Sequence, residues 1–187
     1  MISFIYHWGL MNLEKLFWSK AKVDILKYLI FRRQWISMRA LEAELEWTFP
    51  AIKKQIDSLN DAKVIDVDKE WQWWSICIKK DFFENIKNIF FSGLKQDIIE
   101  LFDSYNIMIS KYYFGKRFGA NLDMDLIVIY KNLEKPQIDK IKDCINEIFR
   151  DYFIETVSVV FMSAEERDKR YRLADRFVLQ ILRCYPN

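Results

Sequence analysis

The amino-acid sequence predicts an α+β protein built from two parts. Up to about residue 61 the apolar residues recur at helical spacing, and two β-rich runs follow. After about residue 92 the pattern alternates between helix and strand in the order αββαβα. Hydrophobic residues make up 51% of the 187 residues, and there are only 4 glycines and 3 prolines. This composition excludes a low-complexity or linker-like chain. The length is sufficient for one large domain or two small ones.

Three helices are expected in the first part. The segment from Leu13 to Phe31 carries an apolar stripe at helical spacing. Ser37 can cap a second helix, Met38 to Leu45, because its hydroxyl can accept a hydrogen bond from the first free N–H groups. Thr48 stands at the same position before a third helix, and Pro50 falls in its first turn, where a missing N–H costs little. The stripe expected to be buried in this third helix is Ile52, Ile56 and Leu59.

Two β-rich runs follow the third helix. Val64 to Val67 and Trp73 to Ile78 are rich in β-branched and aromatic residues, and the polar segment 68–70 between them predicts the turn of a hairpin. Three helices with a tight connection before the third are typical of a helix-turn-helix, and the added hairpin makes it a winged helix. The run from Ser37 to Val67 resembles the winged-helix regulators of the ArsR and MarR type. This resemblance implies double-stranded DNA as the partner and transcription regulation as the role.

The third helix would then be the recognition helix. Small and basic side chains that point away from its apolar stripe suit the major groove. The residues expected to contact DNA are Arg39, Thr48, Ala51, Lys53, Lys54 and Ser58, with Arg32 and Arg33 as further phosphate contacts. The net charge of the whole chain is only +2, which excludes a wholly basic nucleic-acid coat. Winged helices also bind proteins, so a protein partner is the alternative.

A helical segment joins the two parts. Asp81 to Tyr105 has helical spacing, and Ser92 and Gly93 interrupt it, which predicts two helices or one broken helix. We place the domain boundary there, with a winged-helix domain over residues 1–91 and a second domain over residues 92–187.

The second part predicts an α/β domain with a small mixed sheet. Its second strand is apolar on both faces, which is typical of a central strand with cover on each side. Pro136 opens the helix that follows, and Ser163 can cap the last helix. The expected elements are strands over 107–114, 124–130 and 154–161, and helices over 136–152 and from 164 to about 184.

Two aspartates stand at the start of the second strand. Asp123 and Asp125 are two residues apart, so on a strand their carboxylates would point the same way. Adjacent carboxylates repel each other unless a cation lies between them, and Mg²⁺ sites for phosphate chemistry use such pairs. The spacing therefore predicts a metal site. The alternative is a tight hairpin with two solvated aspartates.

A glycine-containing turn precedes the aspartates. Gly115 and Gly119 would let the backbone N–H groups approach a nucleoside triphosphate, and Lys116 and Arg117 would add positive charge beside it. Residues 93–187 resemble the minimal nucleotidyltransferase domains of the DNA polymerase β-like superfamily. The resemblance rests on Phe114-Gly115, Gly119 and Asp123-Met124-Asp125-Leu126. It implies that Asp123 and Asp125 bind Mg²⁺ and are catalytic if the domain is active, and that the Gly115 turn holds the nucleotide.

The sequence departs from that superfamily at two positions. Lys116 stands where the superfamily has a serine after the first glycine, and Ser158 stands where a third carboxylate is expected. Without the third carboxylate no base is evident, and general-base help is worth about 10²–10⁴ in rate. We therefore expect a domain that has lost activity and serves nucleotide sensing or dimerisation. The alternative is an active Mg²⁺-dependent nucleotidyltransferase that modifies a protein or an RNA.

The remaining features concern location. The three cysteines lie far apart and form no paired motif, which favours a reducing cytoplasm over a disulfide framework or a zinc site. The apolar opening of about 11 residues is too short to span a bilayer, so no membrane partner is expected; Met11 is an alternative start to Met1. The sequence as a whole predicts a cytoplasmic DNA-binding transcription regulator. A second copy of the chain, in a homodimer, is a candidate partner beside DNA.

Overall fold

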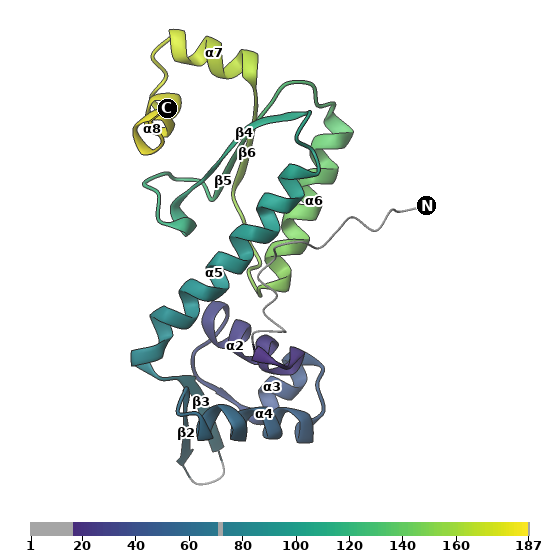
Figure 1. Cartoon of the computed structure of the whole chain (residues 1–187), viewed down its shortest axis with the longest axis vertical. Helices are drawn as coiled ribbons and strands as arrows, with labels where there is room; N and C mark the ends of the chain where they lie inside the picture. The colour runs from purple at the N-terminus through teal and green to yellow at the C-terminus, as the bar shows by residue number, and fades with distance from the viewer. Residues whose placement is uncertain (1–16, 71–72, 187) are drawn as a thin grey trace. The chain divides into compact units, whose positions relative to one another are not determined.

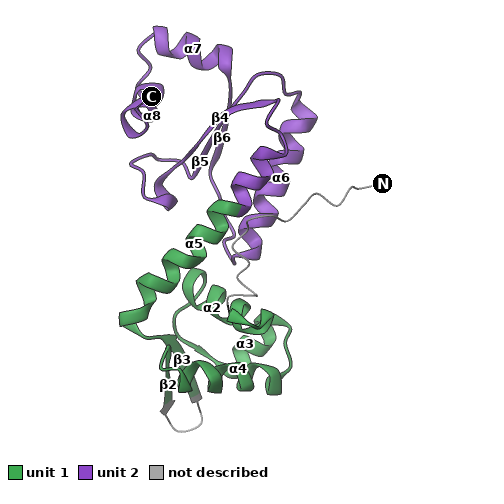
Figure 2. Cartoon of the chain, viewed as in Figure 1, with its two compact units in different colours: residues 1–96 green, residues 97–187 purple. Residues whose placement is uncertain are grey.

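The computed structural model describes residues 17–70 and 73–186 and divides into two compact units, residues 1–96 and 97–187 (Figures 1 and 2). The described residues form seven α-helices and two three-stranded sheets, which confirms the α+β class. The division falls inside helix α5 (Lys80–Asp103), and the expected boundary between residues 91 and 92 lies in the same helix.

Unit 1 contains three helices before its sheet. They are α2 (Lys20–Phe31), α3 (Met38–Leu45) and α4 (Phe49–Asp61). The expected cap of α3 is confirmed, because the Ser37 hydroxyl accepts a hydrogen bond of 3.2 Å from the Ala40 N–H. The expected stripe of α4 is also confirmed: Ile52, Ile56 and Leu59 are all buried.

The expected first helix is broken at residues 18 and 19. Within the described residues Phe17 is helical and α2 starts at Lys20, and residues 13–16 of the expected helix lie outside them. Ser19 has extended backbone, and its hydroxyl accepts a hydrogen bond from the Lys22 N–H, so Ser19 is the N-cap of α2. Trp18 has a φ of 63°, which a continuous helix does not allow. The break was not predicted because the apolar residues keep their helical spacing across it, and this spacing carries no information on backbone angles.

The sheet of unit 1 consists of β1 (Ile36–Ser37), β2 (Ile65–Glu70) and β3 (Trp73–Ile78), all antiparallel, in the order β1-β3-β2. The predicted hairpin is confirmed, but the predicted turn is wrong. Residues 68–70 pair with residues 73–75 and extend β2, and the connection at residues 71 and 72 lies outside the described residues. β1 was not predicted, since a strand of two residues is too short to show a pattern.

Helix α5 is continuous, so neither expected interruption breaks it. The Ser92 hydroxyl donates to the Asn88 carbonyl one turn back, at 2.8 Å, which satisfies the hydroxyl inside the helix. Gly93 is buried, so packing offsets the helix-weakening effect of a glycine. Among the described residues, no helix has the length and apolarity needed to cross a membrane.

Unit 2 contains a mixed sheet. Its strands are β4 (Ile109–Phe114), β5 (Leu126–Tyr130) and β6 (Val159–Ser163), in the order β4-β5-β6. β4 and β5 are antiparallel, whereas β5 and β6 are parallel. The prediction of a central second strand is confirmed, because the first four residues of β5 are fully buried. Helix α6 (Lys135–Asp151) connects β5 to β6 and has Pro136 in its first turn, as predicted.

The last helix is two helices, so the prediction of one is wrong. α7 (Ala164–Arg172) starts at the expected cap, where the Ser163 hydroxyl accepts from the Glu166 N–H at 3.0 Å. The chain then turns through Ala174, whose φ is 53°. Asp175 starts α8 (Arg176–Cys184), because its carboxylate accepts hydrogen bonds from two N–H groups of the first turn.

The sheet of unit 2 has a helical layer on each face (Figure 1). On one face α8 packs against β5, and Val178 and Ile181 join Ile127 and Ile129 in one buried cluster. The other face carries aromatic contacts, including the rings of Phe102 of α5 and Tyr112 of β4, whose centres are 4.9 Å apart. Because both faces are covered, β5 can be apolar throughout.

A buried tyrosine predicts how the stability of unit 2 depends on pH. The Tyr152 hydroxyl donates to the Asp97 carboxylate at 2.8 Å. Burial, and then the charge of Asp97, raise the pKa of Tyr152 above its ordinary value of about 10. The unfolded tyrosine therefore loses its proton at a pH where the folded one keeps it, and stability falls as the pH rises past about 10.

We expect Tyr152→Phe to lower the free energy of unfolding by about 1 kcal/mol at neutral pH and to reduce the further loss between about pH 9 and 11. Urea unfolding across this range measures both effects. Tyr105→Phe, at a half-buried position on the α5–β4 connection, is the control. An equal alkaline loss in the wild type and Tyr152→Phe would contradict the prediction.

Candidate functional site

The turn between β4 and β5 begins at a glycine that the backbone requires. A Cβ on Gly115 would lie 1.7 Å from the Met124 carbonyl oxygen. The Gly115 N–H donates to the Asp125 carbonyl at 2.7 Å, and the Lys116 N–H donates to the Met124 carbonyl at 2.9 Å. The close approach of two backbone segments therefore explains this glycine without a bound phosphate.

The rest of the turn also uses its own N–H groups. The short 3₁₀ helix η1 (Lys116–Phe118) follows Gly115. The N–H groups of Phe118 and Ala120 donate to the Gly115 carbonyl, and that of Gly119 donates to the Lys116 carbonyl. Gly119 has a φ of +91°, which favours glycine for a conformational reason. These donors are therefore engaged within the turn, which differs from a loop that offers its N–H groups to a triphosphate.

The two aspartates lie before β5 and not on it. β5 begins at Leu126, and the chain bends through residues 123–125. Asp125 is buried, with 2% of its surface exposed, whereas Asp123 is exposed. The prediction that both carboxylates project from one face of a strand is wrong, because the two-residue alternation holds only for extended backbone.

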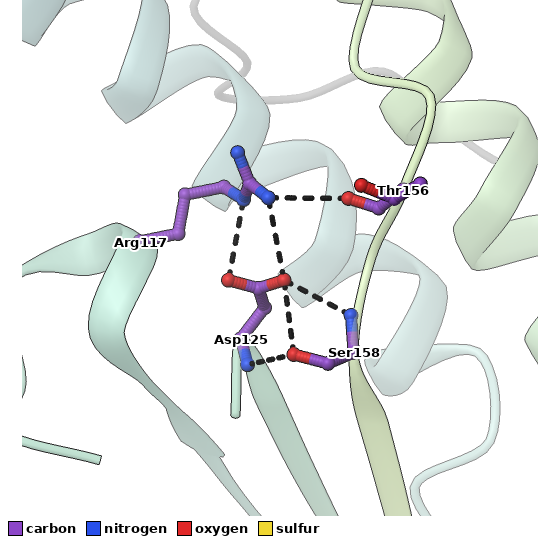
Figure 3. Close-up of polar contacts among 4 residues, drawn as sticks. All are labelled: Arg117, Asp125, Thr156 and Ser158. Carbon is purple, nitrogen blue, oxygen red and sulfur yellow. Dashed lines mark hydrogen bonds and ion pairs between the residues drawn. The ribbon is translucent and has the colours of Figure 1, made fainter. Parts of the chain in front are cut away.

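Protein donors surround the buried Asp125 carboxylate (Figure 3). Its Oδ1 accepts from Arg117 Nε at 3.2 Å, and its Oδ2 accepts from Arg117 Nη2 at 3.4 Å. Ser158 donates to Oδ2 twice, through its N–H at 2.9 Å and its hydroxyl at 3.1 Å. The guanidinium of Arg117 also donates to the Thr156 carbonyl at 3.1 Å. The Arg117 side chain therefore neutralises the one carboxylate and is itself held in place.

One half of this cluster is expected from the sequence. Ser158 stands at the position of the expected third carboxylate, and in the structure it contacts Asp125. The role of Arg117 was not predicted, because its side chain was expected to face a nucleotide. The signal for this role is electrostatic. A buried aspartate that faces a serine in place of a metal site needs a cation to balance its charge, and Arg117 lies in the turn that leads to Asp125.

As placed, these residues do not fit the expected Mg²⁺ ion. Mg²⁺ needs oxygen ligands in near-octahedral geometry, but the Asp125 carboxylate already accepts from Arg117 and Ser158, and Asp123 is exposed. Within residues 17–70 and 73–186 no group of three or more His, Cys, Asp or Glu side chains could hold a metal ion. Mg²⁺ and a nucleoside triphosphate remain predictions.

The second candidate site is the exposed face of α4 in unit 1. Lys53 and Lys54 are exposed there, opposite the buried stripe. They line a shallow open hollow together with Pro50, Asp57, Ser58 and Asp61. Of the other residues expected to contact DNA, Thr48 and Arg39 are exposed and Ala51 is half-buried. The structure thus presents most of the expected contact residues to solvent.

One expected DNA contact, Ser58, and the N-terminus of α4 are engaged within the protein. Glu42 of α3 accepts a hydrogen bond of 3.0 Å from the Phe49 N–H, so a carboxylate occupies the N-terminus of α4. Ser58 accepts a hydrogen bond of 3.0 Å from the Lys22 ammonium group of α2. A DNA phosphate at the start of α4 would meet the Glu42 charge.

Comparison of the chain with protein-family models, curated proteins and solved structures found no match. The chemistry of the two sites therefore carries the functional argument.

The exposed face of α4 has equal numbers of positive and negative side chains, two lysines and two aspartates, around the hollow. Such a face has little net attraction for a phosphate backbone but offers both donors and acceptors. Lysine donates to guanine edges and aspartate accepts from cytosine amino groups in the major groove. The Asp125 cluster, in contrast, offers a neutralised and fully bonded carboxylate.

Proposed function

We propose that the protein binds double-stranded DNA through unit 1 and regulates transcription. The observation that carries the proposal is the way α4 is held: Ile52, Ile56 and Leu59 face the core, and the opposite side with Lys53 and Lys54 is exposed. The element order α2-β1-α3-α4-β2-β3 and the sheet order β1-β3-β2 support the interpretation of unit 1 as a winged helix with α4 as its recognition helix.

Fewer residues are proposed to contact DNA than the sequence alone indicated. Ser58 and the N-terminus of α4 have protein partners and are left out. Lys53, Lys54 and Arg39 are exposed and remain as the basic contacts. Arg32 and Arg33 are also exposed and remain as further phosphate contacts. In a homodimer two copies of α4 would enter successive major grooves, which is the usual use of a two-fold pair of recognition helices. The equal charges around the hollow allow contacts to base edges beside the phosphate contacts of these basic residues.

We interpret unit 2 as a nucleotidyltransferase-like domain without catalytic activity. The antiparallel pair β4–β5, the parallel pair β5–β6 and the crossover through α6 support the fold interpretation. The guanidinium of Arg117 on the Asp125 carboxylate supports the loss of activity, because a metal ion would have to displace a positive charge. In this proposal the unit serves nucleotide sensing or dimerisation.

Lys53→Ala should reduce the salt dependence of DNA binding by about one unit in the slope of log K against log salt concentration, because one phosphate contact is lost. Fluorescence anisotropy with a duplex at several salt concentrations measures the slope. Lys140→Ala, which removes an equal charge from an exposed position on α6, should leave the slope unchanged.

Two results would contradict these proposals separately. A wild-type protein with no salt-dependent association with any duplex would contradict DNA binding. The other result concerns unit 2: transfer of label from a nucleoside triphosphate to an acceptor in cell extract with Mg²⁺, lost in Asp123→Asn and Asp125→Asn, would contradict the loss of catalysis and favour the enzyme alternative.

A further inference from the structure

The sheet of unit 2 has an open edge at β6. The strand order β4-β5-β6 makes β6 an outer strand. The Leu126 N–H of β5 donates to the Ser158 carbonyl at 3.1 Å, and alternate residues of β6 continue this parallel ladder. Val159 and Phe161 therefore direct their N–H and C=O groups away from β5. In the part of the chain that the structure describes, these backbone groups have no hydrogen-bond partner.

The other sheet edges have features that prevent pairing with another chain. β4 has an irregular register between Ile109 and Lys111, and Lys111 is an exposed charged residue. The Phe114 carbonyl at the end of β4 accepts a hydrogen bond from the Tyr185 hydroxyl. In the sheet of unit 1, four of the six residues of β2 are charged, and β1 has only two residues. Bulges, charges and short strands are the usual means by which proteins keep strand edges from pairing.

The residues of β6 provide no such protection. The run from Thr156 to Met162 contains no charged residue and no proline, and it is rich in β-branched residues. Segments of this composition pair readily with other strands. Val159, Val160 and Phe161 are only half-buried, so they leave apolar surface for a neighbour to cover. β6 thus offers both backbone hydrogen-bonding groups and apolar side chains to a partner strand.

A second copy of β6 in antiparallel orientation fits this edge. A two-fold axis near Val160 places Val159 of one copy opposite Phe161 of the other, so that their N–H groups can donate to each other's carbonyls, and symmetry repeats the pair. A β-branched residue opposite an aromatic one is a favourable cross-strand pair. A two-fold axis brings each residue near its own copy, so a charged strand would repel itself. The uncharged strand therefore favours a second copy of the chain as the partner.

The charge next to this strand is balanced within the protein. The Lys142 ammonium group of α6 lies 5.6 Å from the centre of the Phe161 ring. It also forms an ion pair with Asp139, at 3.9 Å. Two copies of this lysine near the axis therefore come with two carboxylates.

We propose that two copies of the chain associate through β6, which joins their two small sheets into one continuous sheet. This inference rests on the dimerisation role proposed for unit 2 and gives that role a surface. It does not depend on DNA binding by unit 1.

Residue-resolved hydrogen exchange of the full chain, with sedimentation to measure its mass, tests the wild type. In the dimer the Val159 and Phe161 amides should exchange at least about tenfold more slowly than after dilution to the monomer. The Val160 amide points towards β5 and should be protected in both states, so it is the internal control. A chain that stays monomeric at all concentrations would overturn both the inference and the dimerisation role. A dimer that leaves the Val159 and Phe161 amides unprotected would overturn the inference alone.

A charge on the edge tests the same surface by substitution. Val159→Lys should weaken dimerisation by at least about tenfold, because the axis brings two lysines together and a charge blocks edge pairing. Val67→Lys adds the same charge at a half-buried valine of β2 in unit 1 and should leave the dissociation constant unchanged. Equal effects of the two substitutions, or no effect of Val159→Lys, would overturn the proposal.

Discussion

Replacing Gly115 by alanine is expected to destabilise unit 2 by about 3 kcal/mol or more. The added Cβ would lie 1.7 Å from the Met124 carbonyl oxygen and 2.7 Å from the carbon of the same carbonyl. The colliding atoms are backbone atoms, so no rotamer change can relieve the contact. Two hydrogen bonds across the turn, from the N–H groups of Gly115 and Lys116, hold the segments at this separation and would have to break or stretch.

Gly119→Ala is the matched control, because it adds the same methyl group four residues later. Nothing lies within 4 Å of a Cβ at Gly119, so its cost comes only from the φ of +91° and should be about 1 kcal/mol. Urea unfolding gives the free energies, and hydrogen exchange at the β5 amides shows whether unit 2 is the part that opens. Equal destabilisation by the two substitutions would show that the close approach at Gly115 costs nothing extra.

The second large effect is expected for Arg117→Ala, at about 3–5 kcal/mol. The Asp125 side chain is 3% exposed, and its carboxylate would keep only the hydrogen bonds from Ser158. A buried charge without its cation is far more costly than the loss of a surface ion pair. Lys116→Ala removes a neighbouring exposed cation and should change the free energy of unfolding by less than about 0.5 kcal/mol.

A double variant distinguishes the charge effect from lost packing. Asp125→Asn removes the charge and keeps the shape, so adding it to Arg117→Ala should recover at least half of the lost stability. Chemical denaturation of the four proteins completes the double-mutant cycle. If the two substitutions add their costs instead, the ion pair is not what makes Arg117 important.

Local signals in the sequence predicted much of the fold. Ser37 and Ser163 mark helix starts because an N-cap depends on one side chain and the next three residues. The central position of β5 followed from apolar residues on both of its faces. Each of these features depends on residues that are close together in the sequence, so the local sequence is sufficient to predict it.

The features that were predicted wrongly or missed depend on contacts distant in sequence or on backbone angles. β1 exists because two residues pair with β3, some forty positions away. The start of β5 at Leu126 depends on the bend at the aspartates, and the break at Ala174 on a positive φ. Arg117 was misjudged because exposure decides its role: on a solvated turn it would be a free cation, but beside a buried carboxylate it is half of an ion pair.

The reciprocal hydrogen bonds between Asp125 and Ser158 also help to set the alignment of β5 and β6. The Ser158 hydroxyl accepts from the Asp125 N–H at 3.0 Å while it donates to the Asp125 carboxylate, and the next residues, Leu126 and Val159, are the first pair of the parallel ladder. No hairpin turn sets the alignment of parallel strands, because a whole helix intervenes. A slip by one residue would bring Val157 or Val159 to the carboxylate, and neither has a side-chain hydroxyl to offer. The hydrogen bonds between Asp125 and Ser158 therefore select one alignment of β5 and β6. The apolar residues of the two strands alone would allow several alignments.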